Sequence, residues 1–143
     1  MSNLHGHQTP PIARQNEIHM TLHAPPPYVT DQSALESLCH TLRQSPRLAL
    51  DTEFVGEDTF IPRLELIQVA TGATAAVIDF PAVQANGSLD VFWELMCDAK
   101  IEKVFHAGRQ DLDLFALHAG QIPKPFFDTQ IAAAMVGSGA QVA

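Results

Sequence analysis

Cysteine and basic residues are scarce in this sequence, and each shortage argues against a class of protein. The 143 residues include two cysteines, Cys39 and Cys97, which are too few for a disulfide scaffold or a zinc knuckle. Lysine and arginine number 8 against 16 acidic residues, so the formal net charge is −8. We therefore do not expect a protein that holds nucleic acid through a basic surface alone.

Long apolar runs are also missing. No segment approaches the roughly 18–20 apolar residues that a membrane-spanning helix needs. Residues 1–8 lack the charged and apolar stretches of a secretory signal. We expect no membrane partner, and the scarcity of cysteine favours the reducing cytoplasm as the location of the protein.

The sequence divides into a short leading segment and one domain. Residues 1–27 hold four of the seven histidines and five of the ten prolines. Because proline lacks a backbone donor, this stretch is predicted to be a flexible N-terminal segment. Residues 28–143 have the apolar content of one globular domain.

Apolar spacing within residues 28–143 predicts alternating helices and strands. A helix is expected between Thr30 and Pro46, and Ser88 is expected to cap another. Short links make three strands an antiparallel meander, over residues 48–54, 64–70 and 74–79, the last closed by Pro81. Two short strands and two helices then alternate, over residues 102–106, 109–118, 126–127 and 128–135. The predicted fold is an α/β fold in which helices flank a mixed sheet.

Acidic residues gather where the first predicted strand ends. Asp51 and Glu53 are two positions apart, so their side chains point to the same face of the strand. Like charges held together repel, and a divalent cation between them relieves the repulsion. Carboxylate oxygens suit Mg²⁺ or Mn²⁺. Two acids that simply face water at a strand end remain the alternative.

Two further acids follow later strands. Asp111 lies in the first turn of a predicted helix, where the helix dipole favours a carboxylate. Asp128 precedes the last predicted helix and suits an N-cap. Because α/β folds place ligands at the carboxyl ends of their strands, Asp111 is expected to approach Asp51 and Glu53.

Four segments together resemble the ribonuclease D family of 3′→5′ exonucleases. They occur in the family's order and spacing, over residues 48–54, 63–68, 105–115 and 127–133. The resemblance covers the chain from about Tyr28 onward and implies a ribonuclease H-like fold. It also implies an enzyme that hydrolyses RNA 3′ ends, as in tRNA 3′ processing, and releases nucleoside 5′-monophosphates.

The resemblance assigns roles to particular residues. Asp51, Glu53 and Asp111 correspond to three acids of the family's catalytic quartet, which holds two Mg²⁺ or Mn²⁺ ions. The fourth acid belongs to a third motif, in which a tyrosine is followed four residues later by an aspartate. The one tyrosine here, Tyr28, precedes the first motif. We therefore expect residues 28–143 to be the N-terminal part of a truncated exonuclease domain, with oligomerisation possible through the face left open.

Three neighbouring residues are candidates for contact with RNA, namely Thr52, Phe54 and His106. Phe54 suits either a wedge against the terminal base or a place in the core. His106 suits either a contact with the terminal nucleotide or a structural hydrogen bond. The alternative to an enzyme is an incomplete, non-catalytic fragment that binds nucleic acid or protein.

Overall fold

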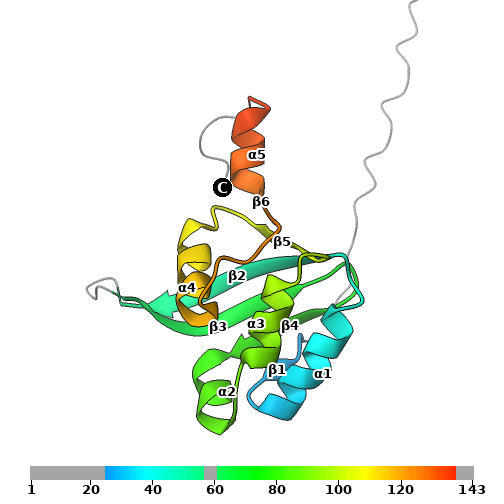
Figure 1. The fold of residues 1–143 in the computed structure, drawn as a ribbon, viewed down its shortest axis with the longest axis vertical. Coiled ribbons are helices and arrows are strands. Elements are labelled where there is room, and N and C mark those ends of the chain that lie inside the picture. Colours follow the sequence, from blue (N-terminus) through cyan, green and yellow to red (C-terminus); the bar gives the residue numbers. More distant parts are fainter. Residues whose placement is uncertain (1–24, 57–60, 138–143) are drawn as a thin grey trace, which may run out of the picture.

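The computed structural model describes residues 25–56 and 61–137, in which a six-stranded sheet carries helices on one side (Figure 1). The strands are β1 (Tyr28–Val29), β2 (Arg47–Val55), β3 (Arg63–Ala70), β4 (Ala75–Asp79), β5 (Glu102–Phe105) and β6 (Phe126–Asp128). The helices are α1 (Gln32–Leu42), α2 (Phe80–Asn86), α3 (Asp90–Cys97), α4 (Arg109–Ala119) and α5 (Thr129–Met135). The strands lie in the order β1-β4-β3-β2-β5-β6, which confirms the α/β fold.

The sheet is mixed, as predicted. Strands β2, β3 and β4 form the antiparallel meander, whereas β5 runs parallel to β2, and β6 runs parallel to β5. The two neighbours of β2 pair with it over different lengths. Strand β3 follows β2 from Ala49 to Val55, but β5 pairs only with residues 47–49. One edge of β2 is therefore without a strand partner from Leu50 onward, and the candidate site lies there.

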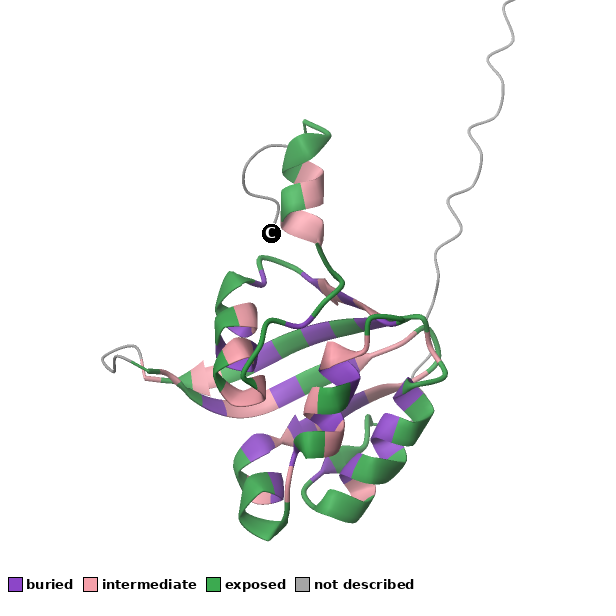
Figure 2. Cartoon of the chain, viewed as in Figure 1, coloured by how far each residue is buried: buried purple, intermediate pink, exposed green. Residues whose placement is uncertain are grey.

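The two faces of the sheet differ because side chains alternate along each strand. One face packs against α1 to α4 and forms the core, with residues such as Leu48, Leu50, Ile67 and Ile78. The other face carries partly or fully exposed residues, and Figure 2 shows this alternation along the central strands. In the described residues, no helix packs on this open face.

Local sequence explains where the helices begin. The structure corrects two expectations, the role of Pro81 and the N-cap at Ser88. Pro81 does not simply close the third strand, because it sits in the first turn of α2, whose N-cap Asp79 accepts a hydrogen bond from the Ala82 amide. This helix was not predicted. The N-cap of α3 is Leu89 rather than Ser88, although the Ser88 hydroxyl accepts a hydrogen bond from the Asp90 amide.

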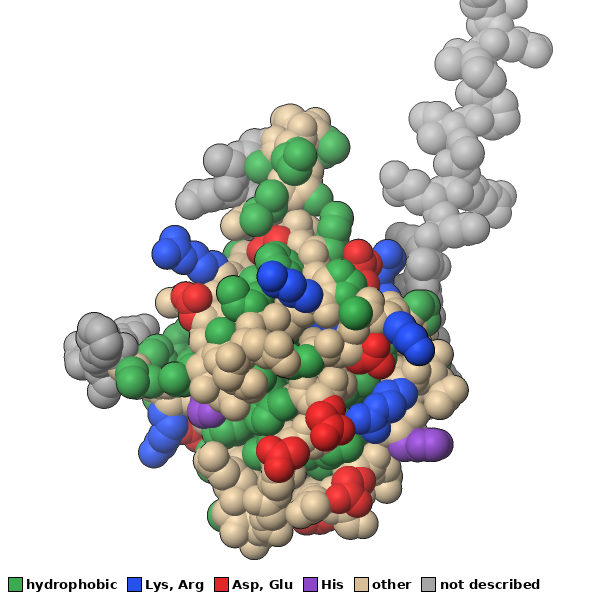
Figure 3. All heavy atoms as spheres, in the orientation of Figure 1, with side chains coloured by type: hydrophobic (Ala, Val, Ile, Leu, Met, Phe, Trp, Pro, Cys, Tyr) green, Lys and Arg blue, Asp and Glu red, His purple; other side chains and the backbone are tan. Residues whose placement is uncertain are grey.

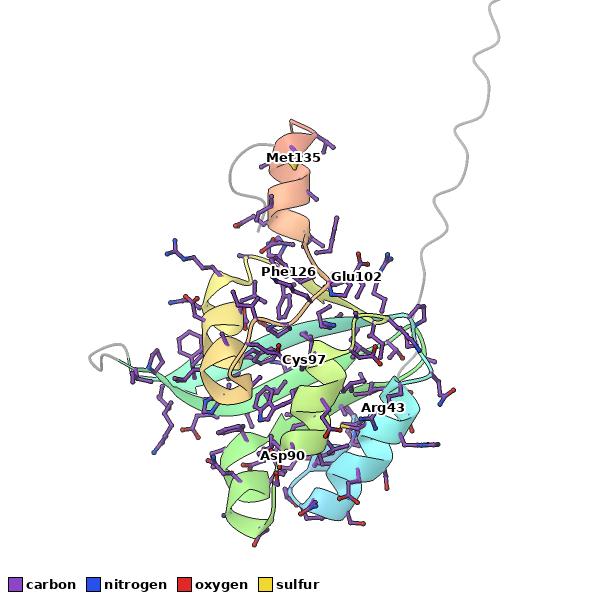
Figure 4. The ribbon with its side chains drawn as sticks, viewed as in Figure 1. Arg43, Asp90, Cys97, Glu102, Phe126 and Met135 are labelled. Carbon is purple, nitrogen blue, oxygen red and sulfur yellow. The ribbon has the colours of Figure 1, made fainter. Side chains whose placement is uncertain are left out.

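The described residues leave out both ends of the chain. Most of the predicted flexible segment, residues 1–24, lies outside the described residues, as do residues 138–143. Helix α5 projects from the sheet, with Met135 83% exposed near its far end (Figure 4). Within the described ranges, none of the helices is long and apolar enough to cross a membrane.

Candidate functional site

Asp51 and Glu53 lie on the open face of β2, as their spacing predicted. Both are exposed, and the intervening Thr52 points to the opposite face and is buried. Asp51 is paired across the ladder with Gln68 of β3. The Gln68 amide Nε2 donates a hydrogen bond of 3.4 Å to Glu53 Oε1. Strand geometry therefore holds two carboxylates side by side, with one amide as a neighbour.

Asp111 comes to the same part of β2 from helix α4. It is the third residue of that helix and is 8% exposed. Its Oδ1 accepts a 2.5 Å hydrogen bond from the Thr52 hydroxyl. Thr52 belongs to the part of β2 that β5 does not cover. The first turn of α4 thus takes the place of a strand partner at this edge.

Burial and a nearby like charge both act on the Asp111 carboxyl. Burial raises its pKa above the ordinary value, because charge is disfavoured where water is excluded. The hydrogen bond from Thr52 lowers the pKa, and the Asp51 charge raises it. The net effect is a raised pKa. Asp51 and Asp111 are therefore close enough to interact electrostatically, although they reach β2 from different elements.

The position of Asp111 depends on how α4 is attached to β5. The Phe105 ring packs edge-on against Phe115 of α4, with ring centroids 6.0 Å apart. Gly108 is the N-cap of α4, and a Cβ there would collide with the Phe105 side chain. Ala107 has a positive φ of 56°, which is uncommon for a residue with a side chain. The turn before α4 is therefore tight.

Asp128 fastens this turn to the start of α5. Its carboxylate accepts hydrogen bonds from the backbone amides of Ala107, Gly108, Gln130 and Ile131. Burial raises the pKa of Asp128, but these four amides together hold it below its ordinary value. The predicted N-cap is confirmed. The bonds to the other junction were not predicted, because no local pattern links residues twenty positions apart.

The structure places the three candidate RNA contacts differently. The Thr52 hydroxyl has a partner inside the protein, Asp111. Phe54 points to the same side as Thr52, packs partly against the core, and lines a hollow that Gln110 and Asp113 also line. The His106 Nδ1 lies 2.8 Å from the Thr129 hydroxyl. Direct contact of these residues with RNA stays a prediction.

The donor set fits a hard divalent cation in its chemistry. Asp51 and Glu53 offer exposed carboxylate oxygens, and Asp111 adds a third carboxylate that interacts electrostatically with Asp51. Among residues 25–56 and 61–137, however, no three His, Cys, Asp or Glu side chains form a group that could hold one ion. Two of the acids therefore lie on β2 and the third on α4, and the three do not surround a single ion position.

Figure 3 shows the helix-covered side of the molecule, on which basic side chains do not gather into one patch. Lysine and arginine side chains lie singly there, with acidic side chains between them. Three of the arginines in the described residues pair with acids, Arg43 with Glu94, Arg47 with Glu102 and Arg63 with Glu65. This face therefore offers no broad cationic surface to a phosphate backbone, in agreement with the composition.

Comparisons with known proteins identify the family. The profile of the 3′-5′ exonuclease family matches residues 26–142. A ribonuclease D of Granulibacter bethesdensis is 44% identical over 117 residues, which are 82% of this chain and 29% of that protein. Escherichia coli RNase D, a solved structure, has a TM-score of 0.77 at 37% identity, over 84% of this chain and 31% of the other.

A third relative is the solved structure of Brucella melitensis NrnC with bound Mg²⁺. Its TM-score is 0.62 at 30% identity, over 79% of this chain and 53% of the other. The chain spans less than a third of the length of the ribonuclease D relatives it matches. The match of the family profile over most of the chain, and the fold it shares with RNase D, show that the chain belongs to the 3′-5′ exonuclease family.

Proposed function

We propose that this protein is a metal-dependent 3′→5′ exoribonuclease of the ribonuclease D type. The observation that carries the proposal is the arrangement of three carboxylates around one strand. Asp51 and Glu53 project from β2, and Asp111 meets the uncovered edge of the same strand. The family match supports hydrolysis of nucleic acid from a 3′ end. The related E. coli enzyme, an exoribonuclease involved in structured RNA processing, supports RNA as the substrate.

In this proposal the three acids hold Mg²⁺ or Mn²⁺. Two such ions, when bound, would lower the pKa of the attacking water and stabilise the departing 3′ oxygen. Asp51 shares a face of β2 with Glu53, and its charge acts on the Asp111 carboxyl. It is therefore the residue best placed to serve both ions. The Mg²⁺ bound by B. melitensis NrnC supports this choice of cation.

Cations held by the acidic side chains would also allow a negatively charged protein to bind RNA. The net charge of −8 repels a phosphate backbone. Bound divalent cations supply local positive charge where the scissile phosphate has to sit. We propose RNA 3′ ends, including those of tRNA precursors, as substrates, nucleoside 5′-monophosphates as products, and the cytoplasm as the location.

A titration with Mg²⁺ on a 5′-labelled single-stranded RNA tests the proposal. We expect a ladder of products shortened one nucleotide at a time from the 3′ end, increasing with Mg²⁺ and abolished by chelation. An otherwise identical RNA with a blocked 3′ end should resist cleavage. Internal cleavage of the blocked RNA, or hydrolysis that survives chelation, would contradict the proposed reaction.

The lack of a closed three-carboxylate group in the described residues favours a second candidate function. In that case the protein binds RNA or a protein without hydrolysing it. The same titration separates the two candidates, because a non-catalytic protein would shift the labelled RNA in a native gel without shortening it. Asp51→Asn should abolish hydrolysis under the first proposal and leave such binding intact under the second.

A further inference from the structure

Thr52 stands between the two exposed acids of β2 but faces away from them. Its side chain is 7% exposed and points to the helix-covered side of the sheet. A threonine hydroxyl carries a single proton. That proton is donated to Asp111 Oδ1 at 2.5 Å. A distance this short is typical of a hydroxyl that donates to a charged carboxylate.

The uncovered edge of β2 explains how α4 reaches Thr52. Strand β5 stops pairing with β2 after Ala49, so the edge of β2 at Thr52 is free for the first turn of α4. The Thr52 hydroxyl therefore holds one oxygen of the Asp111 carboxylate at this edge.

The contact leaves room for a further ligand. A carboxylate offers about four lone-pair positions. Thr52 approaches Asp111 from the strand, while Asp51 lies close enough for its charge to act on Asp111. Asp111 is therefore held by Thr52 and lies close enough to Asp51 for the two charges to interact.

We propose that Thr52 is a positioning residue, which holds the Asp111 carboxylate ready to share a divalent cation with Asp51. This inference rests on the proposed function, and it gives Thr52 a role other than contact with RNA. Side chains that orient metal ligands typically change metal affinity or activity by about 10–100-fold when they are removed. The hydroxyl is the group to test, because it is the Thr52 atom that donates to Asp111 Oδ1.

The test compares Thr52→Val, which removes the hydroxyl at nearly constant shape, with Thr52→Ser, which keeps it. Mn²⁺ binding to the whole chain is measured by electron paramagnetic resonance, and RNA hydrolysis is measured separately. We expect Thr52→Val to weaken Mn²⁺ binding by about 10-fold or more and to lower kcat, with KM for RNA little changed. Thr52→Ser should keep most of the Mn²⁺ affinity and most of kcat.

Thr41→Val is the control, because the Thr41 hydroxyl donates to the Ser37 carbonyl on the exposed face of α1. It should leave Mn²⁺ binding and hydrolysis unchanged. Circular dichroism melting of each variant checks that the fold is kept. If Thr52→Val unfolds the chain, Thr52→Ser and Thr52→Ala decide the matter by the same measurements.

The possible failures are distinguishable. If the unchanged chain neither binds Mn²⁺ nor hydrolyses RNA, the proposed function is wrong, whatever Thr52 does. If the chain binds Mn²⁺, Asp111→Asn abolishes that binding and Thr52→Val leaves it intact, the inference about Thr52 is wrong. A raised KM for RNA at unchanged Mn²⁺ affinity in Thr52→Val would show that Thr52 contacts the substrate instead.

Discussion

Two strand-to-helix junctions, β5–α4 and β6–α5, each place an aspartate near the start of a helix, yet the two carboxylates have different surroundings. Asp128 accepts hydrogen bonds from four backbone amides. Asp111 is bonded to Thr52 and lies within reach of the Asp51 charge. The pKa of Asp128 is lowered, and that of Asp111 is raised.

This difference shows how to tell a structural acid from a candidate ligand. A carboxylate surrounded by amides has its negative charge already satisfied by the protein. A buried carboxylate beside another acid keeps an unfavourable interaction that a cation can remove. Substitutions at the two aspartates and at the residues around them test this difference.

The largest effect is expected at Asp111. Asp111→Asn keeps the shape and the acceptor for Thr52 but removes the charge. Mn²⁺ binding should weaken by about 100-fold or more, at the upper end for changes in a metal site. The melting temperature should stay the same or rise, because a buried like charge is lost. Asp113→Asn, on the exposed side of the same helix, is the control and should bind Mn²⁺ normally.

Lys103 of β5 links the segments that precede β5 and β6, the strands of the two junctions. It is fully buried, and its Nζ donates to the carbonyls of Asp98, Ile101 and Lys124 at 2.6–2.9 Å. Lys103→Met leaves these carbonyls without that donor, which should lower the free energy of unfolding by about 3 kcal/mol. Urea unfolding measures the loss. Lys100→Met, at an exposed lysine, should change stability little, and equal losses in the two variants would contradict this role.

Asp128 should matter for stability and little for cations. Asp128→Ala removes an acceptor shared by four amides and should lower the free energy of unfolding by about 2 kcal/mol, the upper end for an N-cap. Asp31→Ala is the matched cap, since its carboxylate accepts from the Ala34 amide at the start of α1. It should have about half the effect. If Asp128→Ala lost as much Mn²⁺ binding as Asp111→Asn, Asp128 would not be a purely structural acid.

The smallest effect is an opposite response of the two acids to pH. The lowered pKa of Asp128 means that its stabilisation is complete above the ordinary value of 3.8 and is lost as pH falls below it. The raised pKa of Asp111 means that its charge destabilises the fold increasingly as pH rises above 3.8. Urea unfolding from pH 3 to 6 should show the gap between the unchanged chain and Asp128→Ala closing toward low pH. The gain in Asp111→Asn should grow toward high pH, and parallel curves would contradict both signs.

Much of the fold could be predicted because local signals agreed with tertiary packing. The meander of β2, β3 and β4 follows from short links between apolar strands, and Gly120 ends α4 in the left-handed conformation. Helix α2 was missed because Pro81 was interpreted as the end of a strand, whereas proline also suits the first turn of a helix. Because proline suits both the end of a strand and the first turn of a helix, the surrounding packing has to decide between the two.

Less of the candidate site could be predicted. The shared face of Asp51 and Glu53 follows from the period of a strand, and the structure places them there. The bond from Thr52 to Asp111 joins residues 59 positions apart and depends on where β5 stops pairing with β2. Strand pairing across a sheet leaves no periodic signal in one sequence, so neither the bond nor the four-amide setting of Asp128 was predicted.

Residue spacing alone was enough to predict which acids share a face of β2, where most of the helices start and end, and which family the motifs resemble. These features depend on local backbone geometry. The burial of Asp111 against Thr52 and the four amides around Asp128 became visible in the packed fold. The surroundings of a carboxylate are set by the segments that pack against it, and those segments lie far apart in the chain.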